Sequence, residues 1–155
     1  MLTRLRVSGF KNLVDLDLRL GPITCIAGPN AVGKSNLFDA IQFLGALADK
    51  TLLEAATGVR LETSSANAGR IFARGWSGAV RREIRMQADM IVPLTVRDDL
   101  DQEATAGITS LRYTVAVRLQ EGLDMSVPKL ELVEERLDYI TRTSMQKSLS
   151  FAKGR

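Results

Sequence analysis

The chain has 155 residues, of which 45% are hydrophobic and 25% charged, and its formal net charge is +3. This composition is ordinary for one soluble globular domain, and the absence of histidine excludes histidine-based acid–base catalysis, histidine-ligated zinc and a Ser-His-Asp triad. No apolar run approaches the ~20 residues that a membrane-spanning helix needs, and one cysteine cannot form an internal disulfide. We therefore expect a cytoplasmic protein with no membrane partner.

Three strands are predicted ahead of a glycine-rich loop. Apolar and polar residues alternate around Leu5 and Val7 and again from Val14 to Leu20, which is the period of a half-buried strand. The apolar run 23–27 follows a Gly-Pro turn and predicts a buried strand. Cys25 lies inside this run, so we interpret it as a core residue rather than a reactive thiol.

Residues 28–35 read Gly-Pro-Asn-Ala-Val-Gly-Lys-Ser, a complete Gly-x-x-x-x-Gly-Lys-Ser phosphate-binding loop. Its glycines let successive backbone N–H groups point at a phosphate, and the helix that begins near Lys34 adds the partial positive charge of its N-terminus. Lys34 is long enough to reach the β- and γ-phosphates, and the Ser35 hydroxyl can coordinate Mg²⁺. The loop therefore predicts binding of a nucleoside triphosphate; the alternative is a glycine-rich turn whose lysine is merely solvated.

Two helices are predicted after the loop. The first runs from about residue 34 to residue 48, because four positions form one apolar stripe: Leu37, Ile41, Leu44 and Ala48. Residues 51–54, Thr-Leu-Leu-Glu, match a capping box and predict a short second helix that stops at Gly58.

The period-two pattern returns from residue 79 and predicts three long strands over residues 80–92, 111–119 and 129–140. Successive strands with one polar face indicate an antiparallel meander. The alternation slips near Val133, which predicts a β-bulge.

The mild positive charge permits contact with nucleic acid but does not by itself indicate it. The densest group of arginines is better interpreted as the solvated face of strands: Arg70, Arg74, Arg81, Arg82 and Arg85.

The chain therefore divides into three predicted parts. Residues 1–60 are a P-loop nucleotide-binding core of the order β-β-β-P-loop-α, residues 70–141 an antiparallel β-subdomain, and residues 142–155 a basic tail or truncated link.

Two segments also carry a family resemblance. Residues 5–13, Leu-Arg-Val-Ser-Gly-Phe-Lys-Asn-Leu, and residues 28–41, where Gly-Pro-Asn precedes the lysine and Ser-Asn follows it, are similar to the opening of an ABC-type, AAA-family ATPase head. The branch concerned includes structural-maintenance-of-chromosomes (SMC) proteins, RecF-type recombination ATPases and overcoming-lysogenisation-defect (OLD) nucleases. Residues 71–78, with Trp76, resemble the point where this branch enters its antiparallel β-subdomain. Ala31 stands where the branch usually has glycine, a change that matters only where residue 31 needs a positive φ.

The resemblance implies the N-terminal lobe of an α/β P-loop NTPase that binds ATP and Mg²⁺ and serves DNA repair, chromosome maintenance or anti-phage defence. It implies that two heads sandwich ATP, that Lys34 neutralises β/γ-phosphate charge as the one catalytic residue in this segment, and that Ser35 holds the metal. Asn30 is expected near the γ-phosphate or the lytic water, and Lys11 near adenine or ribose. The residues expected to contact the nucleotide are Gly28, Pro29, Asn30, Ala31, Val32, Gly33, Lys34, Ser35, Asn36 and Lys11.

Several elements of such ATPases are absent from the sequence. There is no Walker B run of four apolar residues before Asp-Glu and no Leu-Ser-Gly-Gly signature, and only Gln87 and Gln120 are available for a Q-loop. We therefore expect a lobe that a C-terminal half or a partner chain completes, with DNA as a possible partner of the assembly. Two alternatives stay open: a small-molecule kinase or GTPase of the P-loop class, and a non-catalytic regulatory adaptor.

Overall fold

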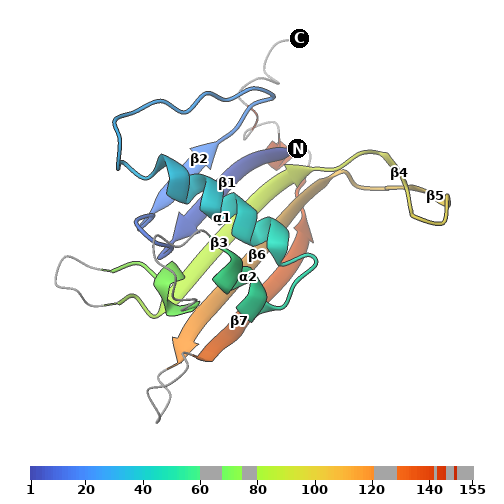
Figure 1. Ribbon diagram of the computed structural model, residues 1–155. Helices are drawn as coiled ribbons and strands as arrows, with labels where there is room; N and C mark the ends of the chain where they lie inside the picture. The colour runs from blue at the N-terminus through green and yellow to red at the C-terminus, as the bar shows by residue number, and fades with distance from the viewer. Residues whose placement is uncertain (60–67, 75–79, 121–128, 142, 146–148, 150–155) are drawn as a thin grey trace.

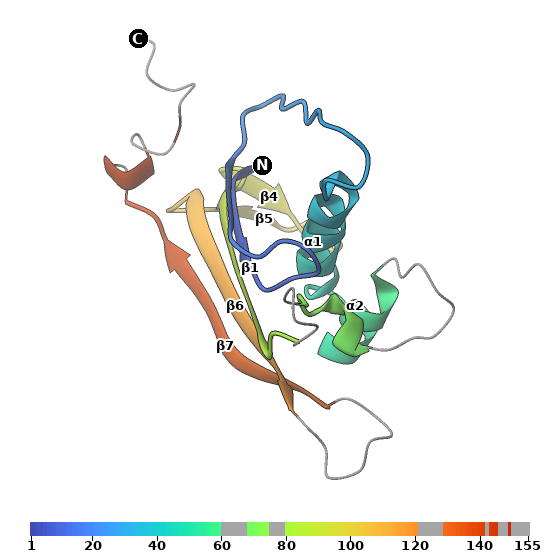
Figure 2. The same ribbon diagram turned by 90° about the vertical axis from the view of Figure 1, so that its left-hand side faces the viewer.

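A five-stranded antiparallel sheet, covered on one face by two helices, forms the body of the protein (Figures 1 and 2). This computed structural model describes residues 1–59, 68–74, 80–120, 129–141, 143–145 and 149. The strand order is β2-β1-β3-β6-β7. The strands are β1 (Leu2–Ser8), β2 (Leu16–Arg19), β3 (Glu83–Ile91), β6 (Ser110–Gln120) and β7 (Lys129–Tyr139).

The remaining elements are connections and cover. The helices are α1 (Lys34–Ala46) and α2 (Leu52–Gly58), and a 3₁₀ turn, η1 (Ala68–Ile71), precedes β3. A separate two-stranded hairpin, β4 (Thr95–Arg97) and β5 (Glu103–Thr105), projects from the connection between β3 and β6 (Figure 1). No helix in the described part of the chain is long and apolar enough to cross a membrane.

The predicted antiparallel meander is confirmed. Strands β3, β6 and β7 pair antiparallel in sequence order, and their apolar side chains alternate onto the face that the helices cover. The predicted bulge is also present: Val117 pairs with Leu132 and Ala116 with Glu134, so Val133 has no partner across the pair. An extra residue on one strand bends that strand locally, which is why the alternation slips there.

The first strand joins this meander. Strand β1 lies between β2 and β3, so that Leu5 pairs with Leu18 on one side and with Ala88 on the other. One sheet therefore contains strands from both of the longer predicted parts, residues 1–60 and 70–141.

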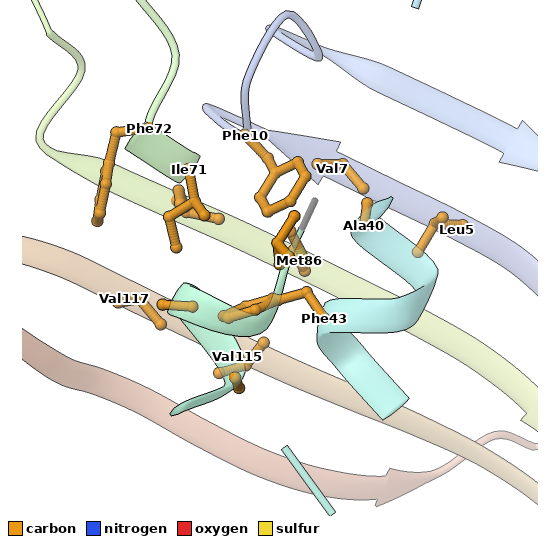
Figure 3. Packing of buried hydrophobic residues seen from close by; sticks show 14 of the residues in the cluster. Leu5, Val7, Phe10, Ala40, Phe43, Ile71, Phe72, Met86, Val115 and Val117 are labelled. Atoms are coloured by element: carbon orange, nitrogen blue, oxygen red, sulfur yellow. The ribbon is translucent and has the colours of Figure 1, made fainter. Parts of the chain in front are cut away.

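The hydrophobic core lies between this sheet and α1 (Figure 3). Leu37 of the predicted stripe is buried, whereas Ile41 and Leu44 are half-buried and Ala48 is exposed. The deepest helix contact comes instead from Phe43, whose ring centroid lies 5.8 Å from that of Phe10 with the planes tilted by 37°. Both rings are fully buried, so the turn after β1 is fixed against the helix.

Helix α2 begins as its sequence predicts. The Thr51 side chain accepts from the Glu54 backbone N–H, and the Glu54 carboxylate accepts from the Thr51 N–H. These two reciprocal hydrogen bonds complete the capping box and satisfy donors that the helix end leaves unpaired.

The buried strand predicted for residues 23–27 is wrong. Residues 21–33 instead form an extended arc that leaves β2, passes outside the sheet and returns at α1 (Figure 2). Ile23 is 89% exposed, and Cys25 is exposed rather than a core residue. A buried strand needs hydrogen-bonding neighbours, and no described strand pairs with this segment.

Candidate nucleotide-binding site

The phosphate-binding loop, residues 28–35, runs directly into the first turn of α1. Gly33 is the residue before the helix and has φ 104° and ψ 10°, a conformation that a residue with a Cβ rarely adopts. No side chain caps the first N–H groups of α1, and its first turn contains no acidic residue. These donors, together with the positive end of the helix dipole, suit an anion.

Lys34 is folded back over the loop. Its Nζ donates to the carbonyl oxygens of Gly28 and Pro29, each at 2.6 Å. The cation therefore lies against the beginning of the loop rather than in bulk water. The loop residues themselves are mostly exposed, among them Asn30, Val32 and Ser35.

Ala31 has φ 65°, in the left-handed region. An L-residue in this region pays roughly 1–2 kcal/mol in contacts between its Cβ and the backbone. The departure from the usual glycine therefore matters here, because residue 31 does adopt the positive φ on which the sequence argument depended.

A tight turn after β1 lies beside the loop. Leu13 N donates to Phe10 O at 2.7 Å, and Phe10 N donates to Leu13 O at 3.2 Å. Lys11 within the turn has φ 48°, and its backbone N donates to Ile71 O at 2.7 Å. The turn is thus held both by the buried Phe10 ring and by a backbone bond to η1.

The side chain of Lys11 points to α1 rather than to open solvent. Its Nζ lies 2.8 Å from Asp39 Oδ2, and the two side chains are 14% and 8% exposed. Sequence reasoning missed Asp39; the available signal is a carboxylate between Phe38 and Ala40 on a helix that must bury one face. The contact of Lys11 with adenine or ribose stays a prediction.

Asn12 connects the same turn to the end of the loop. Asn36 Nδ2, in the first turn of α1, donates to Asn12 Oδ1 at 2.8 Å. The Asn12 carboxamide also lies against Gly33, where a Cβ would be 2.6 Å from Asn12 Nδ2 and 2.8 Å from Oδ1. Of these three residues, only Asn12 was absent from the sequence-predicted nucleotide contacts.

The sheet face opposite the helices carries ion pairs. Arg112 binds the buried Asp89 through two bonds of 2.7 and 2.9 Å, which raises the pKa of the Arg112 guanidinium. The hydrogen bond from Arg4 lowers the pKa of Asp17 to about 2; desolvation opposes this shift, and the charges of Arg4 and Arg6 add to it.

Arg85, one of the five arginines singled out in the sequence, pairs with Glu134 at 2.5 Å. It therefore lies on a face of paired charges, as the solvated-face interpretation expects.

Neither glutamine available for a Q-loop lies at the phosphate-binding loop. Gln87 Nε2 donates to Thr114 Oγ1 at 3.4 Å, on the sheet face away from α1, and Gln120 Nε2 donates to Glu131 Oε2 at 3.0 Å between β6 and β7. Within the described ranges, no cluster of three or more Asp, Glu, His or Cys side chains is arranged to hold a metal. Trp76 and most of the predicted tail lie outside the described residues.

Comparison with known proteins shows that the sequence of this chain matches a family model. The family model described as "AAA domain, putative AbiEii toxin, Type IV TA system" matches residues 23–133. The chain belongs to this AAA-domain family. The matched range begins before the phosphate-binding loop and extends into β7, so it includes both the loop and the meander.

Two curated proteins are similar over shorter segments. The OLD nuclease of Thermus scotoductus (strain ATCC 700910 / SA-01) is 50% identical over 44 residues, which are 28% of this chain and 8% of that protein. The DNA replication and repair protein RecF of Paenarthrobacter aurescens (strain TC1) is 35% identical over 66 residues, 42% of this chain and 16% of RecF. The matched segments thus span less than a fifth of either relative.

A solved structure from work described as "Structural biochemistry of ATP-driven dimerization and DNA stimulated activation of SMC ATPases" aligns with a TM-score of 0.47 and 18% identity. The alignment covers 97% of this chain and 78% of the other.

The family match and the two curated relatives confirm the resemblance to ATPases of the RecF and OLD branch and the α/β P-loop fold class with an antiparallel sheet.

Proposed function

We propose that the chain binds Mg-ATP at residues 28–36 as the nucleotide-binding lobe of a RecF- or OLD-like ATPase. The observation that carries the proposal is the phosphate-binding loop at the N-terminus of α1, with its helix amides uncapped by any side chain and Lys34 lying against Gly28 and Pro29. The first-turn N–H donors suit a β-phosphate, and the Lys34 ammonium suits the charge shared by the β- and γ-phosphates.

The metal is assigned to the Ser35 hydroxyl together with phosphate oxygens. Ser35 is exposed in the first turn of α1, one residue after Lys34, so it can meet a cation held by the phosphates. When bound, Mg²⁺ supplies neutralisation of charge on the phosphate oxygens. The sequence has no Walker B run before Asp-Glu, so we expect binding without rapid turnover by this chain alone.

We further propose that a C-terminal half or a partner chain completes the lobe. The arc at residues 23–27 is mostly exposed, with Ile23 89% exposed and Ile26 half-buried against the core, so it offers a segment that added strands can cover. Such a half would bring the carboxylate that activates water, and two heads would then enclose the nucleotide. The proposed setting is DNA repair, chromosome maintenance or anti-phage defence in the cytoplasm. RecF's name as a DNA replication and repair protein supports the first of these settings.

DNA is proposed as a partner of the assembled ATPase, with no surface of this lobe assigned to it. The arginines of the outer sheet face are poor candidates, because Arg4, Arg85 and Arg112 each pair with a carboxylate. An unpaired guanidinium binds a DNA phosphate more favourably than a paired one, because a paired guanidinium must first break its ion pair with a carboxylate.

A titration of the chain with a fluorescent ATP analogue tests the proposal. We expect saturable, Mg²⁺-dependent binding that Lys34→Ala abolishes, with little hydrolysis. At an ATP concentration 100-fold above Kd, binding stabilises the folded chain by about 2.7 kcal/mol, which is a measurable rise in melting temperature. Absence of saturable binding contradicts the proposal, and rapid hydrolysis by the chain alone contradicts the need for a completing half.

A further inference from the structure

The turn after β1 supports the phosphate-binding loop from the side. Its first residue, Phe10, is fully buried against Phe43 of α1. Its second residue, Lys11, is held through the backbone bond to Ile71 and through the ion pair with Asp39. The third residue, Asn12, therefore projects from a backbone that is fixed on both sides.

Asn12 makes two contacts with the end of the loop. Its Oδ1 accepts from Asn36 Nδ2 at 2.8 Å, which restrains the first turn of α1 two residues after Lys34. Its carboxamide also fills the space beside Gly33, at 2.6 Å from the position of a Cβ. The hydrogen bond and the close packing act on the residues where loop becomes helix.

The backbone at Gly33, where the loop joins α1, needs contacts that hold it in one conformation. Gly33 lies at φ 104°, and a glycine reaches many other conformations at similar energy. The loop before it is exposed, and the two hydrogen bonds from Lys34 restrain its beginning at Gly28 and Pro29 rather than its end at Gly33. For a ligand that binds only one conformation, the apparent Kd is the intrinsic Kd divided by the fraction of time the loop spends in that conformation.

We propose that Asn12 is a positioning residue of the nucleotide site: through Asn36 and Gly33 it holds the loop in the conformation that receives phosphate. This inference rests on the proposed binding of Mg-ATP. Asn12 does not touch the nucleotide; it raises affinity by reducing the number of conformations that the free loop samples.

A double-mutant cycle tests this role, with Asn12→Ala, Asn36→Ala and the double variant. One neutral hydrogen bond is worth about 1 kcal/mol, so Asn12→Ala is expected to raise the Kd for Mg-ATP about five-fold. Because Asn12 acts in part through Asn36, the weakening in the double variant is expected to fall short of the product of the two single effects. Inorganic triphosphate serves as a second probe, since an effect on the phosphate loop must persist without adenine or ribose.

A second readout needs no nucleotide. The Leu37 N–H donates to Gly33 O at 3.1 Å and closes the first turn of α1. We expect hydrogen exchange at this amide to be about five-fold faster in Asn12→Ala, because loss of the contact opens the turn more often.

Thr51→Ala is the matched control. It removes a side-chain hydrogen bond of similar worth from the α2 capping box, away from the loop. It should lower the melting temperature and leave the Kd for Mg-ATP unchanged.

The outcomes separate this inference from the proposed function. A wild-type chain that binds no Mg-ATP overturns both. Binding that needs Lys34 but is unchanged in Asn12→Ala overturns only the role of Asn12, and so do independent effects that multiply to about 25-fold in the double variant.

Discussion

Substituting the second loop glycine, Gly33→Ala, tests whether this backbone conformation is what makes the loop a phosphate site. The matched control is Gly45→Ala, near the other end of the same helix. Gly45 has no positive φ, and a Cβ added there meets nothing within 4 Å.

The expected cost has two parts. A Cβ at φ 104° costs roughly 1–2 kcal/mol. The same Cβ would lie 2.6 Å from Asn12 Nδ2, so the Asn12 side chain must move and release Asn36, which loses about 1 kcal/mol of hydrogen bonding. The total of about 2–3 kcal/mol corresponds to a roughly 30- to 150-fold weaker Kd for Mg-ATP.

The assay measures the Kd for Mg-ATP and the free energy of unfolding, because the cost can appear in either quantity. Because the loop is exposed, it can relax in the free protein, and we expect most of the loss in the Kd and little in the free energy of unfolding. Gly45→Ala should instead raise the free energy of unfolding by about 0.5–1 kcal/mol and leave the Kd unchanged. A Gly33→Ala chain that matches wild type in both affinity and stability would refute the reasoning.

Four further predictions concern stability, each measured by urea unfolding. Gly9→Ala should cost roughly 2–5 kcal/mol, because a Cβ at φ 81° would lie 2.3 Å from Glu83 O and backbone must move; a loss below 1 kcal/mol contradicts this. Asp89→Asn should cost about 2–4 kcal/mol, since it leaves a half-buried guanidinium without its carboxylate; a neutral result would show that the pair is dispensable. Ala31→Gly should gain about 0.5–1 kcal/mol, because relief at φ 65° exceeds the added chain entropy; destabilisation would argue against the positive φ. Because the folded-state pKa of Asp17 is lowered to about 2 from 3.8, its contribution is complete above pH 4 and lost as the pH falls towards 2; Asp17→Asn should therefore differ from wild type at pH 5 and converge with it near pH 2.

Local patterns in the sequence predicted much of the fold. Alternation of apolar and polar residues predicted the strands, and the break at Val133 predicted a bulge, because each depends only on which face a side chain must bury. The Thr51–Glu54 capping box fixed the start of α2 for a similar reason: both partners lie within one helical turn. For the site, the loop motif and the start of α1 at Lys34 follow from the sequence in the same local way.

Features that depend on distant partners were not predictable. Apolar content suggested a buried strand at residues 23–27, but burial requires neighbouring strands that the described chain does not provide. The Lys11–Asp39 pair joins residues 28 positions apart, and the Asn12–Asn36 hydrogen bond joins residues 24 positions apart. A periodic pattern of apolar residues does not predict contacts between such distant side chains. The positive φ of Ala31 was left open by the sequence, because the residue type argues against it while the similar family usually has glycine there.

The position of β1 between β2 and β3 has a consequence for synthesis on the ribosome. Its neighbour β3 begins at Glu83, and the amino terminus of Met1 bonds to Ile91 O, a sequence separation of 90 residues. Chains emerge at roughly 5–20 residues per second, so the nascent phosphate-binding loop waits several seconds before the strand that seats its supporting turn has been translated. During that interval β1 has β2 beside it but not β3, so one of its hydrogen-bonding edges is unpaired.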